Sequence, residues 1–391
     1  MPLLTSGEAD MLVELVASFT ADEIAPRVND YDAAETLPRE ILDKMGALGF
    51  FGGVLSPEYG GLGLDFVTYA RVIEEISKVC NAMGCLVSMP SGLVGAGIER
   101  FGSQSQKQDW LTPLARGEYF GAAGVTEPRS GSDVAGMTTS YVREGDRFII
   151  NGAKAWITNI DIADFFVTFA TRDRALRHRG VTAFIIPRDT PGVSTAPYRN
   201  KLGFRPLCTG DLILRDVTVG PEAVLGEEGG GFAVAMTAVE RGRLGVAARA
   251  LGVAQACLSE AGSFAQTRMA FGQEISNFQI VQSKITDMVV GVETARLLVR
   301  AAAEALDRGE RARRLTSMAK MYASDVAFRS AADAVQIHGA AGVSSEYTVA
   351  RLLRDSKVLQ IVEGSNDLHR ALIAEMELGL RREDVGKGTS S

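Results

Sequence analysis

The chain has 391 residues, is 46% hydrophobic and carries a formal net charge of −7 from 41 basic and 48 acidic side chains. This length and composition are typical of a globular protein with two or three units that each bury a core. Since the chain has no block of Lys and Arg and no apolar run of roughly 20 residues, neither nucleic acid nor a membrane span is expected.

Residues 1–120 are expected to be mostly helical. Apolar side chains recur at helical spacing in residues 12–19. Residues 83–98 are apolar and rich in Gly and Ser, which predicts a buried helix packed closely on a neighbour. A glycine cluster at 60–63 marks a loop. We assign this segment to an N-terminal all-α domain.

Residues 121–225 have the pattern of a β domain. Short runs rich in Val, Ile, Phe and Thr are separated by Gly, Pro or Asp, which is typical of strands and turns. These runs do not alternate with helices, so a doubly wound parallel sheet is disfavoured. A middle β-barrel or sandwich domain is predicted instead. The expected strands are 122–126, 148–150, 165–170, 182–186 and 212–214.

From residue 226 the helical pattern returns and persists. Gly242, Gly245 and Gly252 lie inside the first helical run, 232–265. Glycine is costly in a helix interior, so three of them indicate close helix packing. Further helices are predicted at 280–307, 315–338, 349–361 and 367–380, which favours a C-terminal four-helix-bundle domain. The predicted fold class is therefore α+β, with domains at 1–120, 121–225 and 226–391.

The cysteines and histidines suggest neither disulfides nor metal. The four cysteines form no Cys-x-x-Cys pair and are expected to be reduced thiols of a cytoplasmic protein. The three histidines are scattered without metal-ligand spacing, so no metal site is predicted. The N-terminus lacks a basic region followed by an apolar core, so no signal peptide is expected.

Glu363 lies in a Glu-Gly-Ser turn between two apolar helical segments. Considered alone, the residue is best interpreted as a cap of the next helix, whose first turn begins near Ser365. A carboxylate in such a turn can also remove a proton next to a thioester, if burial raises its pKa. The accompanying hydride would need an acceptor from a cofactor, because no side chain accepts hydride.

Trp156 and Thr158 are the second candidate pair. They face the same side if residues 148–159 are extended. A flat aromatic ring beside a hydroxyl suits a planar cofactor, which the ring can stack on and the hydroxyl can hydrogen-bond. The alternative is a core Trp and an ordinary strand Thr, as in any sheet.

Three weaker patterns accompany these residues. Residues 126–133 form a loop rich in Ser, Gly and Asp, whose glycine lets the backbone approach a ligand. Arg268 suits a pyrophosphate, and Gln279 suits an amide or adenine edge. Glu240 and Arg243 share a helix face, where the simple alternative is an exposed ion pair. Motifs of Rossmann nucleotide binding, the P-loop and the serine-hydrolase elbow are absent from the sequence.

Together, the segments 126–133, 154–159, 268–272, 336–340 and 360–366 resemble the acyl-CoA dehydrogenase family of flavoenzymes, of the short- or medium-chain-like kind. The resemblance covers nearly the whole chain. It implies FAD-dependent α,β-dehydrogenation of an acyl-CoA to the trans-2-enoyl-CoA, with electrons passed to an electron-transfer flavoprotein. It also implies a homotetramer or homodimer and a setting in fatty-acid or lipid metabolism.

By the same resemblance, Glu363 is the catalytic base that takes the α-proton. Trp156 would cover the flavin ring, Thr158 would hydrogen-bond near its N5, and Arg268 would reach the cofactor of a neighbouring subunit. Residues 151–154 resemble the hairpin turn of the family. The implied substrate-binding residues are Ser132, Glu240, Arg243 and Gly364. The implied cofactor-binding residues are Val125, Thr126, Ser132, Trp156, Ile157, Thr158, Arg268, Phe271, Gln279, Gln336, Gly339, Ala340, Ser365 and Asn366.

Several positions depart from the family pattern. Val362 replaces a Tyr present in many members, which leaves the acyl chain length open, and Ala340 replaces a second Gly. Arg129 stands where a small or acidic residue is common, and it either touches an anionic part of the substrate or faces solvent. In an isovaleryl-type subgroup the base projects from the position of Gly242, so this glycine favours Glu363 as the base.

Three alternatives stay open. The acyl group could be tethered to an acyl- or peptidyl-carrier protein in a biosynthetic pathway, an option that Glu240 and Arg129 support. The enzyme could be an oxidase that passes its electrons to oxygen. A non-catalytic flavin-fold subunit or binding protein is disfavoured by the presence of Glu363, Trp156 and Thr158.

Overall fold

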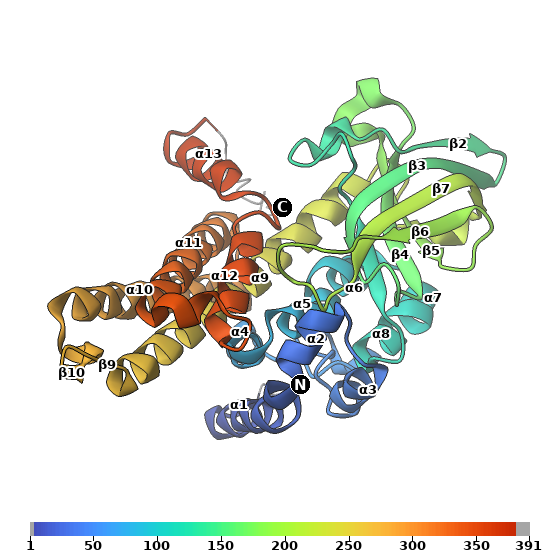
Figure 1. The fold of residues 1–391 in the computed structure, drawn as a ribbon. Coiled ribbons are helices and arrows are strands. Elements are labelled where there is room, and N and C mark those ends of the chain that lie inside the picture. The colour runs from blue at the N-terminus through green and yellow to red at the C-terminus, as the bar shows by residue number, and fades with distance from the viewer. Residues whose placement is uncertain (1–3, 381–391) are drawn as a thin grey trace.

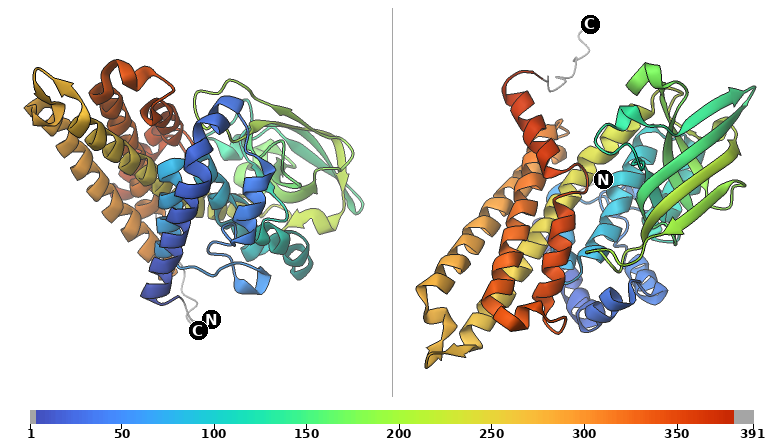
Figure 2. Two further views of the ribbon diagram at one scale, coloured as in Figure 1. Left: turned by 60° about the horizontal axis from the view of Figure 1, so that its bottom comes forward. Right: turned by 45° about the horizontal axis from the view of Figure 1, so that its top comes forward.

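The computed structural model describes residues 4–380, which form helices, then a sheet, then a second set of helices (Figure 1). This order confirms the predicted α+β class with a helical, a β and a helical part. Figure 2 shows the N-terminal helices, in blue, packed between the long C-terminal helices and the sheet. One hydrophobic core runs through all three parts.

The N-terminal helices follow the predicted helical spacing. The first of them begins with a capping box, in which the Thr5 hydroxyl accepts a hydrogen bond from the Glu8 N–H and the Glu8 carboxylate accepts one from the Thr5 N–H. The bounds are α1 Ser6–Phe19, α2 Val28–Ala34, α3 Arg39–Ala47, α4 Phe66–Val79, α5 Asn81–Met89, α6 Gly95–Phe101, α7 Gln104–Gln106 and α8 Thr112–Arg116, and the π-helical turn η4 Pro90–Val94 joins α5 to α6.

The buried helix predicted at 83–98 is part of the stretch Asn81–Phe101, which α5, η4 and α6 form together. This stretch is long and apolar enough to cross a membrane, but 94% of its apolar window is buried inside the protein. The sequence predicted no membrane span, because Gly, Ser and Pro interrupt the apolar residues of this stretch. Within it, a methyl group added to Gly92 would lie 3.3 Å from the Gly242 Cα, so a side chain at position 92 would crowd α9.

The middle part is one eight-stranded sheet with the order β6-β7-β3-β2-β4-β5-β8, and β1 pairs in parallel with β4. Along β4, Phe165, Val167 and Phe169 face the main core, whereas Phe166 and Ala170 face a second core on the other side of the sheet. The bounds are β1 Gly121–Gly124, β2 Ser140–Glu144, β3 Arg147–Thr158, β4 Phe165–Thr171, β5 Val181–Pro187, β6 Val193–Pro197, β7 Thr209–Val219 and β8 Val224–Leu225.

The sheet corrects one expected turn and adds three unpredicted strands, β2, β6 and β8. Residues 151–154 do not turn; β3 continues through them, and the β2–β3 hairpin turns at Gly145, where φ is 60°, and Asp146. The turn was predicted here because the pair Asn151-Gly152 has the sequence of a common hairpin turn. Gly152 serves close packing instead, since a Cβ there would lie 2.6 Å from the Thr139 Cα.

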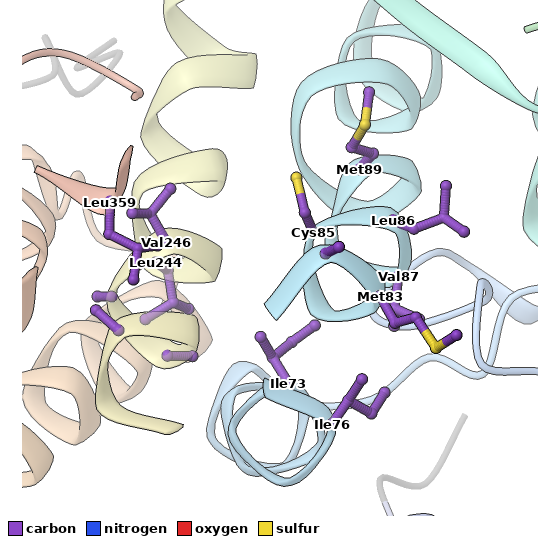
Figure 3. Packing of buried hydrophobic residues seen from close by; sticks show 14 of the residues in the cluster. Ile73, Ile76, Met83, Cys85, Leu86, Val87, Met89, Leu244, Val246 and Leu359 are labelled. Atoms are coloured by element: carbon purple, nitrogen blue, oxygen red, sulfur yellow. The ribbon is translucent and has the colours of Figure 1, made fainter. Parts of the chain in front are cut away.

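The C-terminal part consists of long helices, as predicted. A Cβ on Gly245 would lie 3.1 Å from the Ser88 Cβ, and one on Gly252 would lie 2.4 Å from the Glu74 carbonyl oxygen, which confirms the close packing of α9. Figure 3 shows this contact region, with residues of α4 and α5 facing α9. The bounds are α9 Gly231–Thr267, β9 Met269–Ala270, β10 Gln273–Glu274, α10 Gln279–Asp307, α11 Arg313–His338, α12 Thr348–Leu359 and α13 Asn366–Glu377.

Candidate active site

The turn between α12 and α13 presents Glu363 in an unusual backbone conformation. Glu363 has φ of 58° and Gly364 has φ of 94°, so both lie in the left-handed region. That conformation is strained for a residue with a side chain and is found preferentially at functional sites. The helix cap is Ser365, whose hydroxyl accepts from the Leu368 N–H at 3.2 Å. The capping interpretation of Glu363 is therefore wrong.

The Glu363 carboxylate lies against the bare backbone of Gly242 on α9. A Cβ at Gly242 would stand 2.9 Å from Glu363 Oε1 and 3.0 Å from Oε2. Any larger residue at position 242 would push the carboxylate away. Position 242 is the one from which the base projects in the isovaleryl-type subgroup. In this chain it holds a glycine, which leaves room for the carboxylate of Glu363.

Burial raises the pKa of Glu363 to about 7, although the charges of Arg249, Arg243 and Lys320 act to lower it. The residue as a whole is partly buried. A carboxyl group with a pKa close to neutral can accept a proton and release it at physiological pH. The surroundings therefore give Glu363 the acidity that a general base needs.

Three side chains hold the backbone of this turn, and the sequence analysis missed two of them. Lys320 Nζ donates to the Gly364 carbonyl oxygen at 2.8 Å, and His369 Nε2 lies 3.2 Å from the Glu363 carbonyl oxygen. Burial lowers the pKa of Lys320 to about 7 and that of His369 to about 3. Arg243 Nε donates to the same Glu363 oxygen at 3.4 Å. The one sequence signal for Lys320 is its place on the face of α11 that otherwise buries small residues.

Two further predicted residues serve the same turn. Asn366 is buried, and its side-chain NH₂ donates to Ser324 and Asp325 while its Oδ1 accepts from Lys320 at 2.8 Å. The predicted cofactor contacts of Asn366 and of the cap Ser365 therefore gain no support from the side chains. Arg243 also donates to Ser317, which places it at the base turn, where its predicted substrate contact stays a prediction.

Trp156 and Thr158 both lie on β3, but a register shift between Lys154 and Ile157 interrupts the regular extended strand that the sequence predicted there. Trp156 has φ of 61° and is 63% exposed, so the core-Trp alternative is wrong, and its ring meets the Tyr198 ring edge-on at 4.8 Å. Both rings line an open hollow of about 550 Å³, together with residues 197 and 199–202. Ile157 points into the core of the sheet, so only its backbone could reach a cofactor.

The loop after β1 is held by a buried ion pair. Lys154 Nζ donates to Glu127 Oε1 at 2.8 Å, and both side chains are 0% exposed. Glu127 also accepts from the backbone N–H groups of Thr138 and Thr139. Burial acts to raise the pKa of Glu127, but Lys154 and these hydrogen bonds lower it to about 2. Val125 and Thr126 precede this anchor, and the loop beyond it is exposed, including Ser132 and Arg129.

The remaining predicted residues lie at the opposite end of the bundle. Arg268, Phe271 and Gln279 are exposed in or next to the β9–β10 hairpin, and Gln336, Gly339 and Ala340 are exposed at the end of α11. The two groups meet where Phe264 stacks on His338 at 4.1 Å. Phe264 is 22 residues from Gly242 along α9, or about 33 Å. Within one chain these residues therefore cannot join the site at Glu363 (Figure 1).

The residues near the sheet fit a large planar cofactor and a polar arm. An exposed Trp156 ring, the Thr126 and Thr158 side chains and the open backbone at Gly131 could hold such a group, since nothing lies within 4 Å of a Cβ at Gly131. Glu240 Oε1 is buried without a hydrogen-bond donor among the described residues, which suits an acceptor for a substrate amide.

Comparison with known proteins points to one family. Three family models match the chain: the N-terminal domain of acyl-CoA dehydrogenase at residues 6–118, the middle domain at 122–217 and the C-terminal domain at 229–378. Human mitochondrial short-chain specific acyl-CoA dehydrogenase is 38% identical over 364 residues, which cover 93% of this chain and 88% of the human protein.

Solved structures agree with these sequence matches. Butyryl-CoA dehydrogenase from Megasphaera elsdenii has a TM-score of 0.93 and 36% identity, covering 97% of this chain and all of its own. The prolyl acyl carrier protein oxidase AnaB has a TM-score of 0.92 and 30% identity, covering 96% of this chain and all of its own.

Proposed function

This chain belongs to the acyl-CoA dehydrogenase family, whose members are FAD-dependent oxidoreductases acting on CH–CH groups, and on this premise we propose that it converts an acyl-CoA to the trans-2-enoyl-CoA. The observation that carries the proposal is Glu363, a carboxylate with a pKa of about 7 seated against Gly242.

FAD and the residues of this chain have separate roles in the proposed reaction. FAD, when bound, supplies the two-electron acceptor that side chains lack. Glu363 removes the proton from the carbon next to the thioester, and its position is set by Lys320, His369 and Arg243. We assign Trp156 and Thr158 to the flavin ring and Glu240 to the carrier arm of the substrate, whose amide would satisfy its buried oxygen.

Anaerobic mixing with the right acyl thioester is expected to bleach the flavin, and the rate constant should rise with pH. Only the ionised Glu363 can accept a proton, so activity should appear as pH rises through about 7 and level off above it. Stopped-flow absorbance from pH 5.5 to 9 measures both effects. A rate constant that falls as pH rises through 7 would rule out Glu363 as the base in its ionised form.

A carrier-protein substrate is the second candidate, because the chain is 30% identical to a prolyl acyl carrier protein oxidase over 96% of its length. The exposed Arg129 beside the cofactor loop could then meet an acidic carrier. Turnover of one acyl group on CoA and on a carrier protein separates the two substrates. Peroxide release in air without another acceptor would identify an oxidase.

We also propose a homotetramer, in which the hairpin of one subunit completes the cofactor site of another. Phe271 at the hairpin tip is 97% exposed, and Ile280, Val290 and Leu297 are exposed along α10, which favours burial against a second chain. Phe271→Ser is expected to give a smaller species in sizing chromatography and weaker FAD binding. The control Val142→Ser, at another exposed apolar position, should change neither. A monomer that retains FAD would contradict the shared site.

An electron-transfer flavoprotein in the cytoplasm is the proposed electron acceptor. The four cysteines are buried and free of disulfides, which suits a reducing compartment. Flavin reoxidation by a purified electron-transfer flavoprotein, monitored after substrate reduction, tests this partner; reoxidation by oxygen alone would favour the oxidase alternative.

A further inference from the structure

Arg249 is a buried cation beside the candidate base. It lies on α9 seven residues after Gly242, which is almost two helical turns, so both residues share one face of the helix. Side chains lean toward the N-terminus of their helix, which directs Arg249 back toward Gly242 and Glu363. Its charge is the strongest of the three that lower the pKa of Glu363.

The guanidinium of Arg249 has two buried donors without an oxygen partner, although the Cys85 thiol lies within reach of the group. The residue is only 3% exposed, yet its Nε and Nη1 have no hydrogen-bond partner among residues 4–380. Its neighbours are the Phe204 ring, 5.4 Å from its Cζ, the thiol of Cys85 and Gly84, where a Cβ would lie 3.4 Å from its Cγ. Buried donors of a charged group are costly to leave unpaired, so an acceptor for Nε and Nη1 is expected to come from a ligand.

The other two cations near Glu363 already have oxygen partners. Lys320 donates to the Gly364 carbonyl and to Asn366, and Arg243 donates to the Glu363 carbonyl and to Ser317. The three cations surround one carboxylate. Of the three, Arg249 is the one with two buried donors, Nε and Nη1, that have no oxygen partner among the described residues.

We propose that Arg249 binds a carboxylate at the far end of the acyl group, so that the substrate class is a short ω-carboxyacyl thioester. Two adjacent N–H groups of a planar guanidinium match the two oxygens of a carboxylate. Because Arg249 leans back toward Gly242 and Glu363, a short acyl chain with its α-carbon at Glu363 would place its far end at the guanidinium. The inference rests on the proposed dehydrogenation and names its substrate.

Matched ligand pairs test this assignment. Succinyl-CoA is paired with 4-methylpentanoyl-CoA and glutaryl-CoA with 5-methylhexanoyl-CoA, because in each pair an isopropyl end replaces a carboxylate of the same shape at the same distance from the thioester. Each thioester is offered on CoA and on a carrier protein. The wild type is expected to favour the carboxylate member of a pair by at least about tenfold in the kcat/KM for flavin reduction, because a neutral end leaves buried donors unpaired.

Variants test whether Arg249 causes the preference for a carboxylate end. In Arg249→Gln the kcat/KM of the carboxylate member should no longer exceed that of the neutral member. In Arg249→Lys part of the preference for the carboxylate member should remain. Arg300→Gln, at an exposed arginine of α10, is the control and should leave the ratio unchanged. Calorimetry on Glu363→Gln and on the double variant Glu363→Gln/Arg249→Gln measures binding of the same pairs without turnover, and Arg249→Gln should weaken the carboxylate member at least about tenfold more than the neutral one.

The outcomes separate this inference from the proposed function. Wild-type preference for the neutral members would overturn the inference while leaving the dehydrogenase intact. An unchanged ratio in Arg249→Gln, with both members slowed equally and a shifted pH profile, would overturn it too and would show that Arg249 acts only on the acidity of Glu363. If no thioester reduces the flavin, the proposed function fails, and calorimetry still decides whether Arg249 recognises a carboxylate.

Discussion

Glu363→Gln is expected to bind FAD normally and to lose reduction of that FAD by substrate, with a rate constant lower by at least about 10²–10⁴-fold. Glutamine keeps the shape of the side chain beside Gly242 but cannot take the α-proton. Flavin absorbance after anaerobic mixing with the best thioester measures the loss. Retained reduction at the wild-type rate would show that another group is the base.

The same variant should be more stable than the wild type at high pH. Because burial raises the pKa of Glu363 from 4.5 to about 7 in the folded protein, the folded state loses stability as pH rises from about 4.5 to about 7, and the loss is complete above that pH. Removing the charge should therefore add on the order of 1–3 kcal/mol at pH 8 and little at pH 4. Urea unfolding at both values checks the sign, and it also shows that lost activity does not reflect lost folding.

Glu127→Ala is expected to destabilise the β domain by about 3–5 kcal/mol, because it leaves the buried ammonium of Lys154 without its partner. The free energy of unfolding from urea titration measures the loss. Asp43→Ala, which breaks an exposed ion pair with Arg39, is the matched control and should cost less than about 1 kcal/mol.

The contribution of Glu127 should also depend on pH. Its pKa is lowered from 4.5 to about 2 in the folded protein, so its stabilisation is present above pH 4.5 and is lost as pH falls toward 2. The difference between wild type and Glu127→Gln should shrink over that range. Replacing both partners by apolar residues, as in Glu127→Leu/Lys154→Met, should cost less than Glu127→Ala; an equal or larger cost would mean that the pair itself stabilises the domain.

The elements of this fold were largely predictable because they follow from local patterns. The five expected strands and the helices of the C-terminal part coincide with observed elements, since burial on one or two faces imposes a period that neighbouring residues carry. The prediction of a turn at 151–154 was wrong for a reason that is not local. Gly152 is small because Thr139 approaches it from another segment, and an Asn-Gly pair carries no information about that approach.

The sequence by itself predicted Glu363 as the candidate base through its resemblance to a known family, and the glycine at 242 supported that choice. Only the tertiary structure decided what surrounds that carboxylate. Lys320, Arg249 and His369 come from three different helices, and apart from the small residues that share a helix face with Lys320, nothing in their own neighbourhoods distinguishes them from surface residues. Their burial beside Glu363 depends on packing between segments far apart in the chain, and that packing sets the pKa of the base and leaves two donors of Arg249 without an oxygen partner among the described residues.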